Sequence, residues 1–167
     1  MKIAILAAIA AATVAATIAV PAAAHSDPTS PCSDGQVQVS NGGVESASGH
    51  REVLLIFSLA PGAGPCTLTG YPGVDSGAGG PLIHATRTLS GFMGGVRTDT
   101  LPTVAVSPSQ PAYAVVEGVG FDPRDVNRSC PTYTDLRVTP PDTTDTVTVE
   151  THIDTCQFQV HPVNSEA

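Results

Sequence analysis

One row of side chains near the C-terminal end of the chain could do metal chemistry. Glu150, His152 and Asp154 are spaced two residues apart, so a β-strand would place all three on one face. Carboxylates and imidazoles are metal ligands, and His161 follows soon after. Metal sites, however, usually draw three or four ligands from more than one element and support them with further hydrogen bonds. We therefore interpret the row as the polar face of a strand and predict neither a bound metal nor a cofactor.

A second pattern suggests nucleophilic catalysis. The segment Asp75-Ser76-Gly77 is similar to the loop that carries the nucleophile in serine proteases. That mechanism also needs a histidine base and an acid that orients it, yet the only aspartate between His50 and Ser76 is the neighbouring Asp75. The segment is therefore predicted to be a turn, and the protein is predicted not to be an enzyme. The alternative is a secreted hydrolase or metal-binding enzyme that uses His50, His84 or His152, which requires a cleft shared by these histidines.

Four cysteines complete the set of reactive side chains: Cys32, Cys66, Cys130 and Cys156. An even number of cysteines in an exported domain is typical of disulfides, and three pairings are possible. We prefer Cys32 with Cys66 and Cys130 with Cys156, because each pair joins the edge of one predicted strand to a neighbour close in sequence. Each closed loop would stabilise the domain by about 3 to 4 kcal/mol. The spacing offers no close Cys-x-x-Cys pair of the kind that zinc sites use.

These side chains must be positioned by strands, because no stretch beyond the N-terminal segment shows apolar residues at helical spacing. The central stretch is Gly49–Val74, an apolar strand that ends in a turn rich in proline and glycine. One face of this strand carries Val53, Leu55, Phe57 and Leu59. Shorter alternating segments follow along the rest of the chain. Eight to ten short strands with turn signals between them predict an all-β fold, an antiparallel β-sandwich stapled by disulfides.

The N-terminal segment predicts export. Lys2 precedes the uncharged run Ile3–Val20, and small residues up to Ala24 supply a cleavage pattern. We expect a signal peptide over residues 1–24, with a retained membrane anchor as the alternative for an apolar run of this length. A flexible lead-in (residues 25–31), the β-sandwich domain (32–163) and a C-terminal tail (164–167) would follow, with no membrane segment after cleavage.

The charge of the exported part excludes one class of partner. Lys2 is the only lysine, so residues 25–167 carry six arginines against fifteen acidic side chains, a formal charge of −9. Nucleic-acid binding draws most of its affinity from clustered lysine and arginine, so a nucleic-acid partner is excluded. The absence of tryptophan and the small number of aromatic residues also argue against a carbohydrate-binding platform.

The order of the motifs resembles a known family. Cys32 and Gly49-His50-Arg51 precede CTLTGYPGV at Cys66–Val74, and later come PTVAVSPSQPAYAVV at Pro102–Val116 and CQFQVHPV at Cys156–Val163. This order resembles the actinobacterial secreted and lipoprotein family called domain of unknown function 4232, over nearly the whole exported part. The resemblance implies an immunoglobulin-like sandwich and carries no catalytic residues. The chain departs from the family in two ways, because no lipidation motif precedes Cys32 and because Gly118–Asn127 is unusually rich in charge.

Taken together, these features predict an extracytoplasmic, non-catalytic binding or structural module of the cell envelope. Its partner would be an envelope protein or a cell-wall component. Exposed loops on a rigid scaffold are the usual place for such contacts. We expect them at three segments: Asp75–Pro81, a flexible hairpin tip; Gly91–Thr100, a mobile loop; and Gly120–Ser129, a charged loop.

Overall fold

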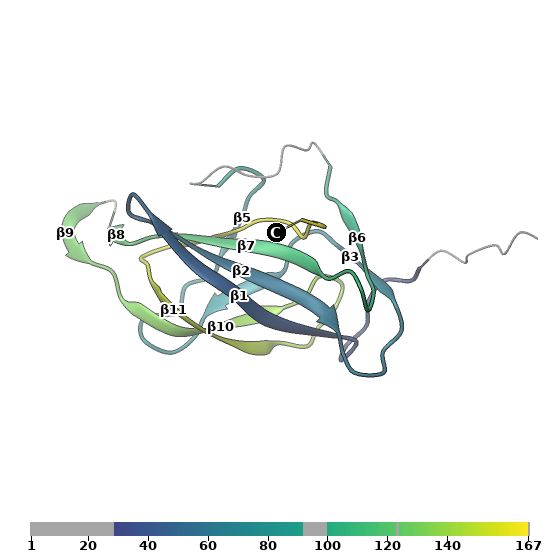
Figure 1. Cartoon of the computed structure of the whole chain (residues 1–167). Helices are drawn as coiled ribbons and strands as arrows, with labels where there is room; N and C mark the ends of the chain where they lie inside the picture. Colours follow the sequence, from purple (N-terminus) through teal and green to yellow (C-terminus); the bar gives the residue numbers. More distant parts are fainter. Residues whose placement is uncertain (1–28, 92–99, 123, 167) are drawn as a thin grey trace, which may run out of the picture.

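The structure is a computed structural model that describes residues 29–91, 100–122 and 124–166, and its regular elements are all β-strands (Figure 1). The predicted signal peptide (1–24), most of the lead-in and residues 92–99 of the predicted mobile loop lie outside the described residues. The strands are β1 (Val37–Ala47), β2 (His50–Leu59), β3 (Cys66–Thr69), β4 (Gly73–Ser76), β5 (Thr86–Arg87), β6 (Thr103–Val106), β7 (Ala112–Val119), β8 (Phe121–Asp122), β9 (Asp125–Ser129), β10 (Thr132–Thr139), β11 (Val147–Asp154) and β12 (Phe158–Val160). Within the described ranges, no helix has the length and apolar character needed to cross a membrane.

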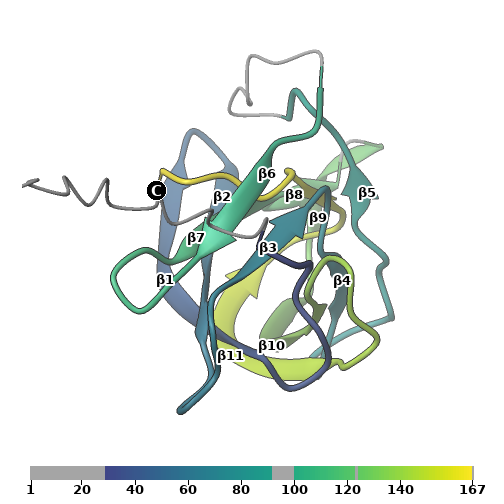
Figure 2. The ribbon, with the colours of Figure 1, turned by 90° about the vertical axis from the view of Figure 1, so that its right-hand side faces the viewer.

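The strands form several sheets, none of which closes on itself. The largest has the order β1-β2-β7-β12-β5 and is antiparallel except for the β12–β5 pair. The second has the order β11-β10-β4 and is antiparallel throughout. Two small sheets, β3–β6 and β8–β9, lie at opposite ends of the molecule in Figure 1, and β3–β6 faces the reader in Figure 2. The prediction of an all-β fold is therefore confirmed.

The core is one hydrophobic cluster that takes side chains from both larger sheets and from β3–β6. Val53, Leu55 and Phe57 on β2 are fully buried, which confirms the face predicted for this strand. The opposing sheet contributes Leu136 and Val138 from β10, also fully buried. Each such side chain contributes about 1.5 to 3 kcal/mol of hydrophobic stabilisation. The alternation along β2 thus fixes which face of the five-stranded sheet turns inward.

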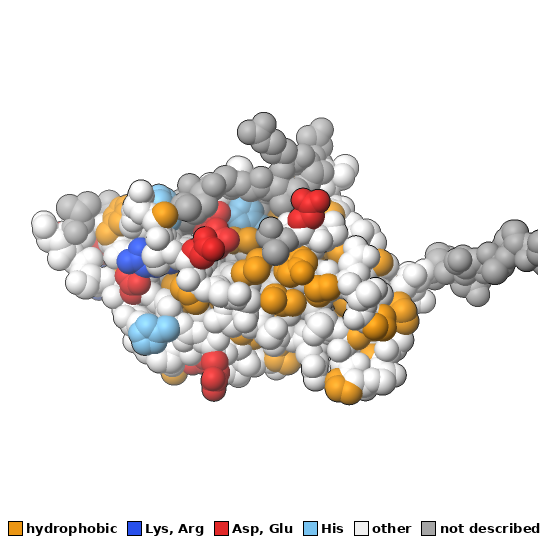
Figure 3. All heavy atoms as spheres, in the orientation of Figure 1, with side chains coloured by type: hydrophobic (Ala, Val, Ile, Leu, Met, Phe, Trp, Pro, Cys, Tyr) orange, Lys and Arg blue, Asp and Glu red, His pale blue; other side chains and the backbone are white. Residues whose placement is uncertain are grey.

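The other face of β2 turns outward and is also apolar. Leu54 and Ile56 are half-buried there, and they pair with Val115 and Tyr113 of β7. Figure 3 shows hydrophobic side chains gathered on this face of the molecule, with acidic side chains beside them.

Both disulfides of the structure have the pairing that the sequence favoured. Cys32 is bonded to Cys66 at the start of β3, and Cys130 is bonded to Cys156 between β11 and β12. Among the described residues no cysteine is free. Two disulfides indicate an oxidising, extracytoplasmic location.

The segment Asp75–Pro81 differs from the flexible tip that the sequence predicts. Asp75 and Ser76 belong to β4, and the following residues lie against β10. The Gly77 amide donates to the Asp135 carbonyl at 2.9 Å, and the Thr134 amide donates to the Ala78 carbonyl at 3.0 Å. The glycines allow the backbone of this segment to lie close to the neighbouring strand β10. The segment is therefore a hydrogen-bonded edge of the sheet and not a free tip.

Candidate functional site

The three histidines of the enzyme alternative lie on different elements. His50 begins β2, His152 is exposed on β11, and His84 follows β4 with its Nδ1 atom 2.6 Å from an Asp75 carboxylate oxygen. Ser76 is buried, and its hydroxyl accepts from the Ile83 amide at 2.8 Å and donates to the Pro81 carbonyl at 3.2 Å. This hydroxyl holds the turn and does not face solvent as a nucleophile would.

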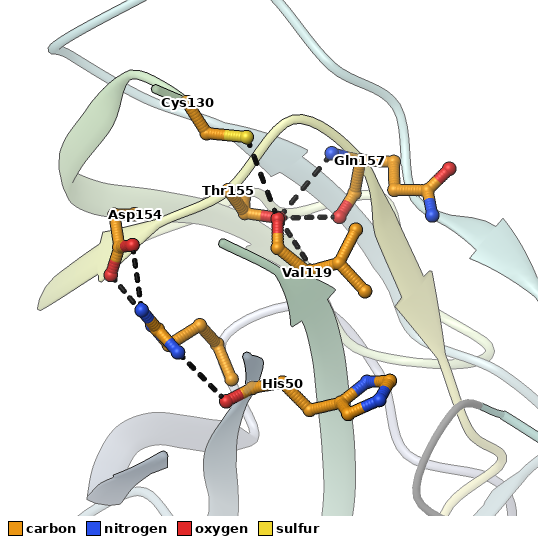
Figure 4. A network of polar contacts seen from close by, with 7 residues as sticks. His50, Val119, Cys130, Asp154, Thr155 and Gln157 are labelled. Carbon is orange, nitrogen blue, oxygen red and sulfur yellow. Dashed lines mark hydrogen bonds and ion pairs between the residues drawn. The ribbon is translucent and has the colours of Figure 1, made fainter. Parts of the chain in front are cut away.

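The row predicted from Glu150, His152 and Asp154 does lie on one strand, β11. Glu150 and His152 are exposed, while Asp154 forms a two-pronged ion pair with Arg51 of β2, with nitrogen–oxygen distances of 2.7 and 2.8 Å (Figure 4). In the part of the chain that the structure describes, no group of three or more histidine, cysteine, aspartate or glutamate side chains is placed to hold a metal ion.

The Arg51–Asp154 pair shifts both groups toward their charged forms. The hydrogen bonds from Arg51 lower the pKa of Asp154 below its ordinary value, and the same bonds raise the pKa of Arg51. Asp154 lies 103 residues beyond Arg51 in the sequence, so no local pattern indicates this pair. This pair joins β2 to β11 and is a structural tie between sheets.

A cleft of about 380 Å³ lies beside the β8–β9 hairpin, and we call it the arginine cleft. Its volume falls within the range of pockets that hold small ligands. The charged and polar side chains that line it are Asp122, Arg124, Arg128 and Gln157, and the other lining residues are Pro81, Ile83, Pro131, Tyr133 and Cys156. Two of the three predicted contact loops, Asp75–Pro81 and Gly120–Ser129, therefore meet at one site.

The apolar wall of the cleft is held rigidly. The Tyr133 hydroxyl donates to the Pro81 carbonyl at 2.8 Å, and burial raises the pKa of Tyr133. A methyl group on Gly80 would lie 2.7 Å from the Pro131 Cβ and 2.8 Å from the Tyr133 hydroxyl, so only glycine fits at this position. Because Ser76 also binds Pro81, the wall is fixed from two sides.

The charged wall is the β8–β9 hairpin. Asp122 has a side chain only 16% exposed and accepts a hydrogen bond from the Arg124 amide at 2.9 Å. Arg128 is 73% exposed, and its guanidinium lies 3.6 Å from the Asp122 carboxylate. Within the described ranges, no acidic group forms an ion pair with the exposed Arg124 guanidinium. The cleft thus holds two positive charges and one negative charge on a chain of net charge −8.

The buried hydroxyl of Thr155 holds the backbone beside the β8–β9 hairpin in place. Thr155 Oγ1 donates to the Gln157 carbonyl at 2.7 Å and accepts from the Val119 amide at 3.1 Å (Figure 4). Figure 4 shows the Gln157 side chain pointing away from this network. The Cys130–Cys156 disulfide adds a covalent link on the same side. Gln157 is therefore fixed by its backbone, and among the described residues none forms a hydrogen bond with its side-chain amide.

A buried acid–base pair lies elsewhere, on the outward face of the five-stranded sheet. His161 Nε2 is 3.0 Å from a Glu117 carboxylate oxygen, and the side chains are only 5% and 3% exposed. The Nδ1 atom of His161 has no hydrogen-bond partner among the described residues. A methyl group on Gly91 would lie 2.6 Å from His161 Nε2, so this glycine closes over the pair. A single glutamate within an apolar strand is the only sequence signal for this pair.

A second cavity of about 390 Å³ lies near the turn between β2 and β3. It is lined by apolar and small residues that include Ile56, Ala63 and Pro108, and no charged side chain lines it. Ligand sites usually combine apolar walls with a few convergent polar groups. The arginine cleft meets that description and the second cavity does not.

Comparison with known proteins places the chain in a family. The model of the family described as Domain of unknown function (DUF4232) matches residues 32–164. The search of curated proteins and the search of solved structures found no match. The match runs from the first disulfide cysteine to just beyond β12, and it includes all the residues that line the arginine cleft. The chain belongs to the DUF4232 family.

Proposed function

We propose that this protein is an exported, non-catalytic binding module of the cell envelope and that the arginine cleft is its binding site. The observation that carries the proposal is the convergence of two separate loops and two arginines on one cleft of an acidic chain. The charged departure from the family pattern, Gly118–Asn127, supplies part of this wall. Its partner would be an envelope protein or a cell-wall component.

The non-catalytic role is supported by the geometry of the candidate groups. The Ser76 hydroxyl is used within its turn, and the histidines lie on separate elements. A rigid scaffold with exposed side chains on its loops suits recognition better than bond-breaking chemistry. Because one fold can host many functions, the proposal rests on the cleft and not on the family.

We take the two larger sheets to form an immunoglobulin-like sandwich, because their buried side chains share one cluster. We also take residues 1–24 to be a cleaved signal peptide. Mass spectrometry of the protein recovered from the host should find His25 at its N-terminus, and a retained Met1 would contradict cleavage. A crystal structure should show the two sheets as layers about 10 Å apart.

Photo-crosslinking in the host cell tests the binding site. A benzophenone amino acid at Leu82, which is 62% exposed beside the cleft, should yield one reproducible adduct. The matched control places the same group at Gly64, which is exposed in the turn between β2 and β3 at the opposite end of the molecule (Figure 1). Adducts at Gly64 equal to those at Leu82, or none at Leu82, would overturn the proposal.

A further inference from the structure

We infer that the arginine cleft binds an organic monoanion, namely a carboxylate carried on a compact apolar body. This inference rests on the proposed function, because it names the ligand chemistry of the same cleft. Three properties of the lining residues support it: the two guanidinium groups are available, the cleft has a net positive charge, and the wall opposite the hairpin is apolar.

Both arginines can still bind a ligand. Arg124 has no ion-pair partner among the described residues, and its backbone amide alone is held by Asp122. The Arg128–Asp122 distance of 3.6 Å exceeds the range of about 2.7 to 3.2 Å for a nitrogen–oxygen hydrogen bond. A guanidinium presents a planar set of donors that matches the two oxygens of a carboxylate. A carboxylate entering the cleft would therefore find donors that the protein itself does not saturate.

The charge of the cleft favours one negative charge over two. Arg124 and Arg128 supply two positive charges and Asp122 one negative charge, so a monoanion makes the site neutral. A dianion such as a phosphate monoester would leave an excess negative charge on a chain that already carries −8. The partly buried Asp122 lies on the same wall and would repel the second charge.

The opposite wall requires an apolar body. Pro81, Ile83 and Pro131 present aliphatic surface to the cleft. Tyr133 is fully buried and its hydroxyl donates to the Pro81 carbonyl, so it supports this wall without adding surface to it. Gln157 adds one uncommitted amide, which could bind a neutral polar group of the ligand. The ligand would thus place its carboxylate at the hairpin and its apolar part against the rigid wall.

The test is an NMR titration of the oxidised protein with N-acetyl-leucine and with its neutral analogue, N-acetyl-leucine amide. The acid should cause saturable shifts at residues 81–83, 122–131 and 156–157. The amide should bind about tenfold more weakly or worse, because a charge-assisted hydrogen bond is lost. Inorganic phosphate, titrated in mildly alkaline buffer where it is mainly a dianion, serves as the dianionic arm and should bind more weakly than the acid.

Two charge-matched double variants locate the effect. Arg124→Gln with Arg128→Gln should weaken binding of the acid about tenfold or more, because each substitution removes one charge-assisted hydrogen bond to the carboxylate. Arg87→Gln with Arg137→Gln changes two exposed arginines outside the cleft and should change affinity by less than about twofold. The spectra themselves report whether each variant is folded.

Any one of four results would overturn the inference. These are no shift with the acid, equal binding of acid and amide, stronger binding of phosphate, and equal losses in both double variants. The proposed function would survive these outcomes if Leu82 still gave its specific adduct in cells. Loss of that adduct together with intact binding of the acid would instead contradict the envelope partner.

Discussion

Three glutamates lie side by side on the outward face of the five-stranded sheet, and Glu52 is the middle one. It pairs directly with Glu45 on β1 and with Glu117 on β7. Burial raises the pKa of Glu52 above its ordinary value of 4.5, and repulsion from Glu45 and Glu117 raises it further, while His161 acts in the opposite direction. The folded protein therefore holds this proton more tightly than the unfolded chain does. It follows that the Glu52 contribution to stability falls as the pH rises from 4.5 through the raised value.

Replacing Glu52 by glutamine should stabilise the protein at pH 7. Removing a like charge from a directly opposed pair is expected to raise the free energy of unfolding by about 0.2 to 1 kcal/mol. The gain should disappear in acid, where Glu52 is protonated anyway. Urea unfolding at pH 7 and pH 3.5 measures it, with Glu166→Gln, which is exposed and lies outside the strands, as the charge-matched control. A destabilised Glu52→Gln variant at pH 7 would show that the carboxylate makes a favourable contact.

The Arg51–Asp154 pair should act with the opposite sign. Because Arg51 lowers the pKa of Asp154, the stability it contributes is present above the ordinary value of 3.8 and is lost as the pH falls through the lowered value. Arg51→Gln should cost about 0.5 to 1 kcal/mol at pH 7, a value reduced by the partial exposure of the pair. The difference from the parent protein should shrink in acid unfolding curves, whereas Arg87→Gln, exposed on β5 and opposite Val160, should be close to neutral. A pH-independent cost would mean that Arg51 acts through packing alone.

At the scale of the element, the turn between β4 and Ile83 depends on glycines that permit close approach. Gly79 has a φ of 122°, and a methyl group there would collide with the Thr132 carbonyl oxygen. Gly79→Ala should therefore lower the free energy of unfolding by about 2 kcal/mol or more. The control is Gly64→Ala, because nothing lies within 4 Å of its methyl position and a change within about 0.5 kcal/mol is expected. Equal effects in urea unfolding would contradict the close packing of this turn.

The sequence predicted where the strands lie along the chain better than it predicted which strands lie beside one another. Alternation identified the buried face of β2, because Val53, Leu55 and Phe57 recur with a period of two. The same reasoning treated the glycines after Asp75 as a flexible tip, because glycine content alone does not distinguish a free turn from close packing. The packing depends on the pairing of β4 with β10, which lie about sixty residues apart.

For the same reason, the sequence predicted the separate loops of the candidate site but not that they meet. The charge of Gly120–Ser129 marked it as a contact loop, and Asp75–Pro81 was marked by its turn residues. No local pattern shows that Pro81 and Arg128 line one cleft, because the sheet topology and the Cys130–Cys156 disulfide bring them together. The ion pair of Arg51 likewise has no local signal, because Asp154 is distant in sequence.

At the scale of the whole molecule, the two disulfides should contribute equally to stability but unequally to ligand binding. They close loops of similar length, with sequence separations of 34 and 26 residues, so replacing either cysteine pair by alanine should cost about 3 to 4 kcal/mol. Only the Cys130–Cys156 bond lies in the wall of the arginine cleft. Its removal should weaken N-acetyl-leucine binding in the NMR titration, while removal of Cys32–Cys66 should not. Equal losses of binding would show that the cleft depends on global stability alone.

Hydrogen–deuterium exchange of the intact oxidised protein, with and without envelope extract of its host, tests binding at the arginine cleft without assuming a partner. We expect slower exchange only in peptides that contain residues 81–83 and 122–131, and we expect this protection to be lost when Arg124 and Arg128 are both glutamine. Protection centred on the outward apolar face of β2 and β7, or no protection anywhere, would contradict binding at the arginine cleft.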